Sequence, residues 1–162
     1  MKAWKKICCA VDLEVQSRVA MAQAADLATT LDAELTLVHV IAPPLEAASD
    51  VLVSSRGLAS VDAQEAEATL ARWRADAEGL AGRPVSARVL QGEPAAEIVR
   101  HAREERCDLL VLGTHGRTGM SRLVLGSVAE RVARRSPCPV LVVHDHEAIE
   151  GRDVAEEAGQ YR

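Results

Sequence analysis

The stretch Leu112-Gly-Thr-His-Gly-Arg-Thr-Gly-Met-Ser-Arg-Leu-Val-Leu-Gly126-Ser127 joins two segments with different hydrophobic patterns. Before it, the short apolar run 109–112 is typical of a buried strand. After it, residues 127–135 show the apolar spacing of a helix. A strand, a glycine-containing loop and a helix in this order predict a parallel sheet covered by helices.

The same alternation of short apolar runs and longer helical patterns continues through the whole chain. The run 35–41 is apolar at nearly every position, as in a strand buried on both faces, whereas 85–90 alternates with polar residues and suits an edge strand. A single α/β domain with a five-stranded parallel sheet is therefore expected. The five predicted strands cover residues 7–12, 35–41, 85–90, 109–112 and 140–143.

Helices are expected between these strands. Ser17 is predicted to cap the first of them. Pro43 and Pro44 open a segment that we interpret as a loose loop as far as Gly57, with a capping box at Asp62 and Glu65 starting the second helix. The third helix is predicted to start at residues 92–94. The predicted inward faces comprise Ala20, Ala24, Leu27 and Leu31 in the first helix, Ala66, Leu70, Trp73, Ala77 and Leu80 in the second, and Ile98, Val99 and Ala102 in the third.

The composition is that of one globular domain. Of the 162 residues, 48% are hydrophobic and 27% are charged. The aromatic share is 2% and phenylalanine is absent, so Ala, Val and Leu must fill the core. The net charge of -5 argues against a nucleic-acid partner, because phosphate backbones select for clustered Lys and Arg.

The amino-terminal lysines precede an apolar run, but Asp12 ends this run too early for an export signal. No stretch approaches the ~20 apolar residues of a membrane span, so a cytoplasmic protein is expected. The four cysteines lack the C-x-x-C spacing of a metal site, and we interpret them as reduced core residues. Residues 145–162 are expected to form a polar, acidic tail outside a domain of residues 1–144.

Three glycines and a serine stand at set intervals in the opening stretch, namely Gly113, Gly116, Gly126 and Ser127. Glycine lets backbone N–H groups approach an anion closely, and the start of a helix adds unpaired N–H groups and the positive end of its dipole. Ligands of open parallel sheets bind beyond the carboxyl ends of strands, where this loop lies. The stretch therefore predicts a phosphate-binding site.

A simpler interpretation of the same residues stays open. The glycines could only turn the chain, while Ser127 and Glu130 form an ordinary capping box. Two other phosphate-binding patterns are absent: the stretch is not a G-x-x-x-x-G-K-S/T loop, and no G-x-G-x-x-G follows the first strand.

The chain resembles the universal stress protein family over residues ~5 to ~144. Within that family, the spacing G-x2-G-x9-G-S/T marks the members that bind ATP. The resemblance implies a doubly wound α/β domain with strand order 3-2-1-4-5 and helices on both faces. It is carried by Ile7-Cys-Cys-Ala-Val-Asp12, Leu37-Val-His-Val40, Gly92-Glu-Pro-Ala-Ala-Glu-Ile98, the stretch from Gly113 through Gly126-Ser-Val-Ala-Glu-Arg-Val132, and Cys138-Pro-Val-Leu-Val-Val143.

The family also implies a site for an adenine nucleotide. Asp12 and the backbone of Val40 would meet the nucleoside, with Leu112 and Gly113 near the ribose, and the later residues would hold the phosphates. From the residues alone, Asp12 could equally cap a turn, and Val40 could be plain core. The implied binding residues are Val11, Asp12, Val40, Leu112, Gly113, Gly116, Gly126, Ser127 and Val128.

Glu14 departs from the family pattern, which often has serine at this position. A carboxylate there could repel a phosphate, point to solvent or help to hold a metal ion. No metal site of the protein's own is expected, and Mg²⁺ or Mn²⁺ would arrive with the nucleotide.

The leading interpretation is an ATP-binding stress or signalling protein whose nucleotide-bound state is recognised by an unknown protein partner. A slow ATP hydrolase and a nucleotide-free interaction module are the alternatives. Candidate groups for hydrolysis are Glu14, His115, Arg117 and Arg122. A homodimer is expected through the strand 140–143, which would otherwise be a flat apolar edge.

Overall fold

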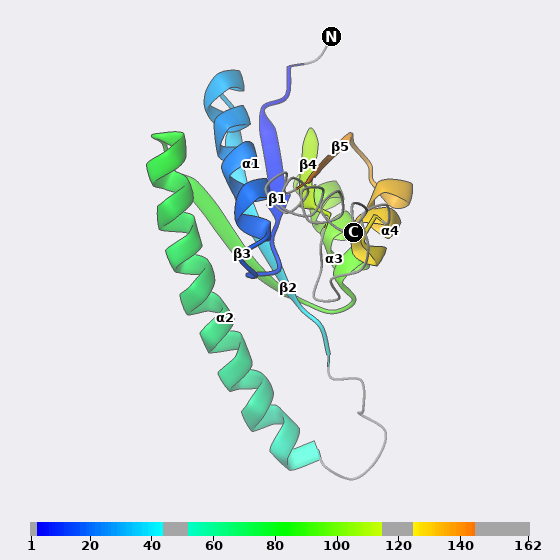
Figure 1. Cartoon of the computed structure of the whole chain (residues 1–162). Helices are drawn as coiled ribbons and strands as arrows, with labels where there is room; N and C mark the ends of the chain where they lie inside the picture. The colour runs from blue at the N-terminus through cyan, green and yellow to red at the C-terminus, as the bar shows by residue number, and fades with distance from the viewer. Residues whose placement is uncertain (1–2, 44–51, 115–124, 145–162) are drawn as a thin grey trace, which may run out of the picture.

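The structure is a computed structural model that describes residues 3–43, 52–114 and 125–144, with side chains left out for 52–62. Its strands and helices alternate along the chain, as the hydrophobic pattern predicted (Figure 1). The strands are β1 Lys6–Ala10, β2 Glu34–Ile41, β3 Val85–Gln91, β4 Leu109–Gly113 and β5 Val140–Val143. The helices are α1 Ser17–Leu31, α2 Leu52–Ala81, α3 Pro94–Glu104 and α4 Ser127–Arg135.

The five strands form one parallel sheet in the order β3-β2-β1-β4-β5, which confirms the expected topology. The chain winds outward from β1 to β3 and then returns to the other side of β1 to form β4. The winding direction therefore reverses between β1 and β4. Their register is fixed by pairs such as Ala10 with Leu112.

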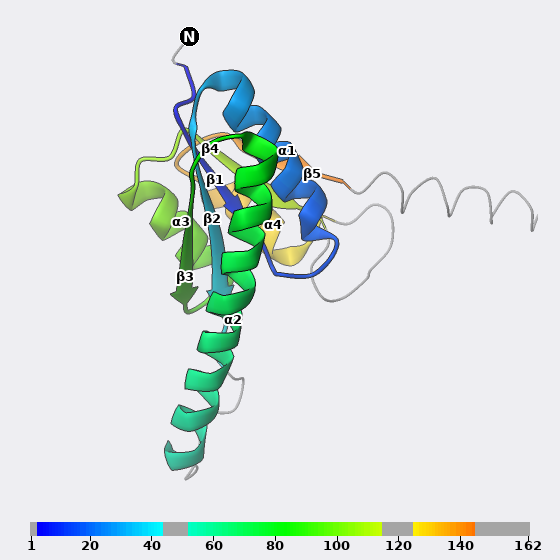
Figure 2. The same ribbon diagram turned by 90° about the vertical axis from the view of Figure 1, so that its left-hand side faces the viewer.

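Helices cover both faces of the sheet, with α1 and α2 on one face and α3 and α4 on the other (Figures 1 and 2). Successive side chains of a strand point to opposite faces, and β1 shows this directly. Cys9 packs in the cluster beneath α1 and α2, while Cys8 packs in the cluster beneath α3 and α4.

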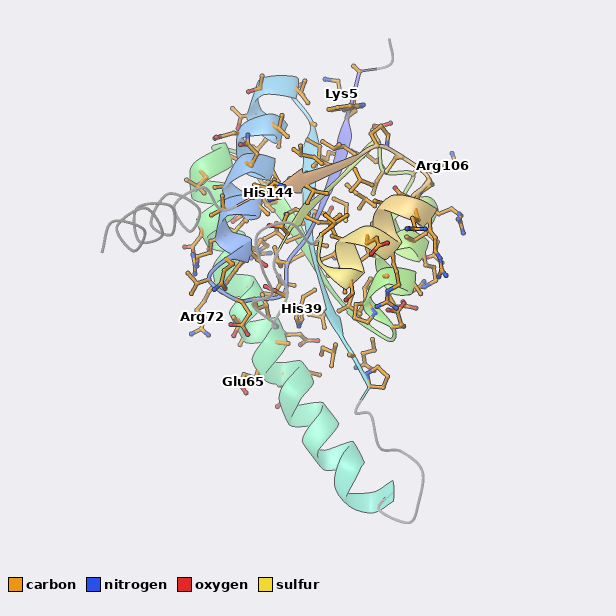
Figure 3. All side chains as sticks on the ribbon, turned by 45° about the vertical axis from the view of Figure 1, so that its right-hand side comes forward. Lys5, His39, Glu65, Arg72, Arg106 and His144 are labelled. Atoms are coloured by element: carbon orange, nitrogen blue, oxygen red, sulfur yellow. The ribbon has the colours of Figure 1, made fainter. Side chains whose placement is uncertain are left out.

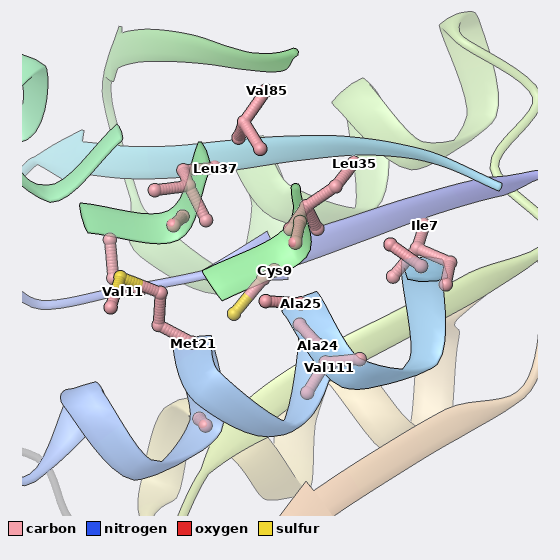
Figure 4. Packing of buried hydrophobic residues seen from close by; sticks show 14 of the residues in the cluster. Ile7, Cys9, Val11, Met21, Ala24, Ala25, Leu35, Leu37, Val85 and Val111 are labelled. Carbon is pink, nitrogen blue, oxygen red and sulfur yellow. The ribbon is translucent and has the colours of Figure 1, made fainter. Parts of the chain in front are cut away.

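Alanines let α1 lie close to the sheet. Ala20, Ala24 and Ala28 are fully buried, and larger residues such as Leu37 and Val111 fill the space from the strands (Figure 4). Small residues on the helix and branched residues on the strands thus build this core without phenylalanine.

The second helix differs from its prediction at its start. It begins at Leu52, so Gly57 and Asp62 lie inside it and the predicted loop and capping box are wrong there. Gly57 is tolerated although an interior glycine costs about 1 kcal/mol relative to alanine. At about 1.5 Å per residue, the 30 residues of α2 span about 45 Å. Its amino-terminal half extends past the carboxyl ends of the strands (Figures 1 and 2).

One residue of the predicted inward face of α2 is exposed in the structure. Leu70, Trp73 and Ala77 are buried as predicted, but Leu80 is 55% exposed and Ala81 is buried in its place. Ala77 and Ala81, four residues apart, both pack in the cluster beneath α1 and α2.

The third helix starts at Pro94, within the predicted segment, and Glu93 caps it. The Glu93 carboxylate accepts hydrogen bonds from the N–H groups of Ala95 at 3.3 Å and Ala96 at 2.9 Å. In the part of the chain that the structure describes, no helix is long and apolar enough to cross a membrane.

Candidate functional site

The candidate site lies at the carboxyl ends of β1 and β4, where the winding direction of the sheet reverses. Val11 and Asp12 follow β1, and Gly113 ends β4. Ala10 pairs with Leu112, so the residues that follow these two strands start from adjacent positions on the same edge. Two segments far apart in sequence are thereby brought together.

Asp12 closes a tight turn after β1. Its Oδ1 atom accepts a hydrogen bond from the backbone N–H of Glu14 at 3.0 Å and another from the hydroxyl group of Ser17. Leu13, between Asp12 and Glu14, has a positive φ of 65°. The turn interpretation of Asp12 is therefore correct, and the turn fixes where its carboxylate lies.

Ser17 has a different role from the predicted one. It is the first residue of α1, and Gln16 occupies the cap position without a side-chain hydrogen bond. The Ser17 hydroxyl oxygen instead accepts the backbone N–H of Asp12 at 3.2 Å while donating to its carboxylate. The spacing of five residues between a strand-ending aspartate and a serine is the signal that sequence reasoning missed.

His39 supports the other side of the same turn. The N–H of Val11 donates to the carbonyl oxygen of Val38 at 2.9 Å, which extends the pairing of β1 with β2 by one residue. The Nδ1 atom of His39 lies 2.9 Å from the carbonyl oxygen of Val11. Because a carbonyl oxygen only accepts, this nitrogen carries the proton. His39 is thus a satisfied, partly buried residue, as predicted, at the carboxyl end of the sheet (Figure 3).

The remaining strand residues of the predicted site expose mainly their backbones at this edge. Val11 and Leu112 are each 4% exposed, and their side chains belong to the two hydrophobic clusters on opposite faces. Val40 is partly buried and packs against the same cluster as Leu112. Their side chains therefore contribute to the core near the carboxyl ends of the strands.

A hydrogen bond joins the two ends of the loop after β4. Thr114 is 5% exposed, and its N–H donates to the carbonyl oxygen of Val143 at 3.1 Å. Its own carbonyl oxygen accepts the N–H of Gly126 at 3.2 Å. Gly113 has room for a methyl group, because a Cβ atom there would lie 3.9 Å from the nearest neighbour, in Ala20. The chain thus leaves β4 and returns to α4 at almost the same point.

Among the described residues, no side chain caps the start of helix α4. Gly126 occupies the cap position with φ -55° and ψ 145°. Any residue can adopt this conformation, so the backbone does not require glycine here. No capping box forms between Ser127 and Glu130, since Glu130 pairs with Arg134 at 2.8 Å. Ser127 is exposed and Val128 is partly buried. The first N–H groups of α4 lack acceptors within the helix, which leaves them available to an anion.

Four residues predicted in the loop after β4 lie outside the described residues: Gly116, His115, Arg117 and Arg122. Among the residues that the structure does describe, no group of three His, Cys, Asp or Glu side chains is arranged to hold a metal ion.

The strand order and the position of the candidate site define a doubly wound α/β protein with its site at the switch point of the sheet. Residues 3–144 match the model of the Universal stress protein family. The chain belongs to the universal stress protein family, which confirms the resemblance.

Relatives agree in sequence and in structure. Universal stress protein MJ0531 of Methanocaldococcus jannaschii is 35% identical over 144 residues, which are 86% of this chain and 82% of that protein. Universal stress protein UspA from Lactobacillus plantarum shares the fold, with a TM-score of 0.80 at 22% identity over 88% of this chain and 99% of that chain. A universal stress protein solved in complex with cAMP has a TM-score of 0.67 and 27% identity, covering 88% of this chain and 98% of that chain.

Proposed function

We propose that this chain binds an adenine nucleotide, ATP in particular, at the switch point between β1 and β4. The observation that carries the proposal is that the Asp12 turn and the start of α4 lie at the same edge of the sheet, because Ala10 pairs with Leu112 and Gly126 is hydrogen-bonded to Thr114. An acidic hydrogen-bond acceptor and a set of backbone donors suit the two ends of a nucleotide. The proposal is also supported by the family member solved with cAMP, which carries the same adenine nucleoside.

The nucleoside end of the ligand would lie against β1 and β2. The Asp12 carboxylate, held by Ser17, would accept hydrogen bonds from ribose or base, and the backbone groups of Val11 and Val40 would contact the base. The hydrogen bond of His39 to the Val11 carbonyl would keep this backbone in place. Leu112 and Gly113 would line the ribose through their backbones.

The phosphate end would lie at the start of α4. The N–H groups of Ser127 and Val128 and the positive end of the helix dipole would stabilise negative charge. The Gly126 N–H donates to the carbonyl oxygen of Thr114. To donate to a phosphate, it would have to exchange this hydrogen bond for one to the ligand. Gly116 completes the proposed set, and Mg²⁺ or Mn²⁺ would be held mainly by the phosphates.

We also propose that the protein forms a homodimer through β5, and that a protein partner reads its nucleotide-bound state. Of the two edge strands, β3 carries the exposed Ser86 and Arg88, whereas β5 consists of Val and Leu only. Charged residues protect an edge from pairing, and an apolar edge invites it.

Mass spectrometry of the purified, denatured full-length protein tests the nucleotide proposal, since a tightly held ligand is released and identified by its mass. If the protein is empty, calorimetric titration with ATP and magnesium follows, with cAMP and GTP as comparisons. Binding of ATP or cAMP in preference to GTP is expected. A protein that carries no nucleotide and binds neither adenine ligand would contradict the proposal.

A further inference from the structure

Helix α4 carries the N–H groups of the proposed phosphate site, yet its own packing is modest. It has nine residues, of which Ala129 and Val132 are buried. Helices this short are marginal on their own, so contacts with the rest of the domain must hold α4 in place. The hydrogen bond from Gly126 to Thr114 is one such contact. Helix α3 lies next to α4 on the same face of the sheet (Figure 1) and supplies another.

Arg131 joins the start of α4 to the start of α3. Its Nη1 atom lies 2.9 Å from Oε1 of Glu93, and its Nε–H group donates to the carbonyl oxygen of Ser127 at 3.2 Å. Ser127 is the first residue of α4. The Arg131 side chain thus runs back toward the start of its own helix, as helical side chains generally do, and reaches across to α3. One guanidinium group therefore contacts both helix starts.

Glu93 is a partner that is already held in position. Its carboxylate caps α3 by accepting the N–H groups of Ala95 and Ala96. The preceding residue, Gly92, donates its N–H to the carbonyl oxygen of Ile41 at 3.0 Å, and Ile41 ends β2. An ion pair loses less side-chain entropy when one partner is already fixed. The acid of this ion pair is therefore anchored to the end of β2.

The ion pair connects the two halves of the proposed nucleotide site. Val40, whose backbone would meet the base, precedes Ile41, and Ser127 would supply an N–H group to the phosphates. The Arg131 side chain is 46% exposed and that of Glu93 is 45% exposed. Ion pairs this exposed stabilise a fold little. The main consequence of this one is the position of the first turn of α4.

We propose that Arg131 and Glu93 are positioning residues of the nucleotide site, whose ion pair holds the first turn of α4 where its N–H groups meet the phosphates. This inference rests on the proposed nucleotide site. The affinity for ATP should depend on the ion pair, whereas the affinity for adenosine, which has no phosphates, should not. A purely structural role would lower the two affinities together.

Calorimetric titration of the full-length protein with ATP and magnesium tests the proposal, and adenosine is titrated in competition with ATP so that a weak affinity is also measured. Arg131→Gln breaks the ion pair. It should weaken ATP binding about three- to fivefold, the upper range for one exposed ion pair, and change adenosine binding less than about twofold.

Glu93→Asp separates position from charge. Aspartate keeps the negative charge and is a preferred capping residue, but it is one methylene group shorter and should no longer reach Arg131 from the cap position. ATP binding should weaken by a similar factor. The double variant of Glu93→Asp and Arg131→Gln should bind ATP no more weakly than either single variant, because both changes break the same interaction.

Arg134→Gln is the matched control. Arg134 also places a positive charge on α4, and it forms an ion pair at 2.8 Å with Glu130, one turn earlier in the same helix. Its replacement should leave both affinities near wild type. Circular dichroism checks that each variant is folded, and urea unfolding checks that the three single variants have similar stability.

Hydrogen exchange without nucleotide gives a second measurement. Peptides that cover α4 should exchange faster in Arg131→Gln and Glu93→Asp than in the wild type and in Arg134→Gln. Unchanged exchange in both ion-pair variants would overturn the positioning role whether or not the protein binds ATP.

The titrations distinguish the remaining outcomes. A wild type that binds neither ATP nor adenosine would contradict the nucleotide site itself. If the wild type binds ATP and Glu93→Asp binds it equally well, any loss in Arg131→Gln is an effect of charge, and the positioning role is wrong. Equal losses of ATP and adenosine binding would leave the ion pair a structural role only, which also overturns the proposal.

Discussion

Ser17 and Asp12 form two mutual hydrogen bonds between the end of β1 and the start of α1. The serine hydroxyl donates to Oδ1 of the aspartate and accepts its backbone N–H at 3.2 Å. Ser17 is 4% exposed and Asp12 is partly buried. The effect of these hydrogen bonds is to hold the carboxylate of the proposed nucleoside site in one position before any ligand arrives.

We predict that Ser17→Ala weakens ATP binding about five- to tenfold. The variant removes one hydrogen bond to the carboxylate, worth on the order of 1–1.5 kcal/mol, and frees Asp12 to rotate. Calorimetric titration measures the affinity, and urea unfolding measures the accompanying loss of stability.

Thr29→Ala is the matched control for this experiment. The Thr29 hydroxyl also sits on α1 and donates to Ala25 and Ala81 at 3.0 and 2.9 Å, far along the helix from Asp12. It should lose a similar amount of stability and keep the affinity of the wild type. Equal binding losses in both variants would mean that stability, and not the position of Asp12, governs affinity.

Gly126→Ala tests whether the loop holds phosphate or only turns the chain. The backbone of Gly126 is compatible with alanine, so folding and thermal stability should stay near wild type. Binding should fall at least tenfold, because a methyl group would keep the phosphate away from the N–H groups and each charge-assisted hydrogen bond is worth about 1.5–3 kcal/mol. Gly116→Val should behave in the same way, and Ser127→Ala should do less because its N–H group remains.

Gly79→Ala supplies the control for the glycine variants. Gly79 lies in α2 with open space around its Cα atom, so alanine should stabilise the helix by up to about 1 kcal/mol without changing affinity. Wild-type ATP binding by Gly126→Ala and Gly116→Val in calorimetry would show that the phosphate proposal is wrong.

Glu14 should make nucleotide binding depend on divalent ions. Its side chain is exposed on the turn that Asp12 closes, and a carboxylate near phosphates adds like-charge repulsion. Glu14→Ser should therefore raise the affinity for ATP without magnesium and change it less when magnesium is present. Unchanged affinity in both titrations would mean that Glu14 points away from the ligand.

The purified protein should be a homodimer by light scattering at micromolar concentration. Val142 belongs to neither hydrophobic cluster of the described residues yet is partly buried on β5, so Val142→Glu should place a charge at the interface and give a monomer. Leu80→Glu, on an exposed position of α2, is the control and should remain dimeric. A wild-type monomer mass would exclude pairing through β5.

His101 should make the fold less stable in weak acid. It is 7% exposed on α3, its Nε2 atom has no hydrogen-bond partner among the described residues, and burial lowers its pKa. The nearby Glu105 and Glu104 oppose the shift, whereas Arg88 and Arg100 add to it. Protonation therefore favours the unfolded chain: this stability is complete above the unfolded pKa of ~6.5 and is lost as pH falls below it, by at most about 1.4 kcal/mol per pH unit.

Urea unfolding at several pH values between 7.5 and 5 checks the prediction for His101. His101→Leu should show a shallower loss of stability than the wild type over this range. Parallel curves for the two proteins would assign the acid sensitivity to other groups.

Much of the fold was predictable because it depends on local patterns. The period of two in β1 assigns Cys8 and Cys9 to opposite faces, and the helical spacing of Leu70, Trp73 and Ala77 predicts their burial. The error in the second helix arose from local turn signals. Gly57 and the prolines suggested a loop, yet α2 begins at Leu52.

The sequence by itself determined which segments become strands and helices, and it identified Asp12 and Gly126 as residues of interest through their motifs. Only the tertiary structure decided which polar groups meet: Ser17 with Asp12, and His39 with the Val11 carbonyl. The physical reason is that element type follows from backbone preference and the period of apolar residues, which act over a few neighbours. Contacts across the sheet depend on strand order and register. These are set by how the whole chain buries its apolar residues.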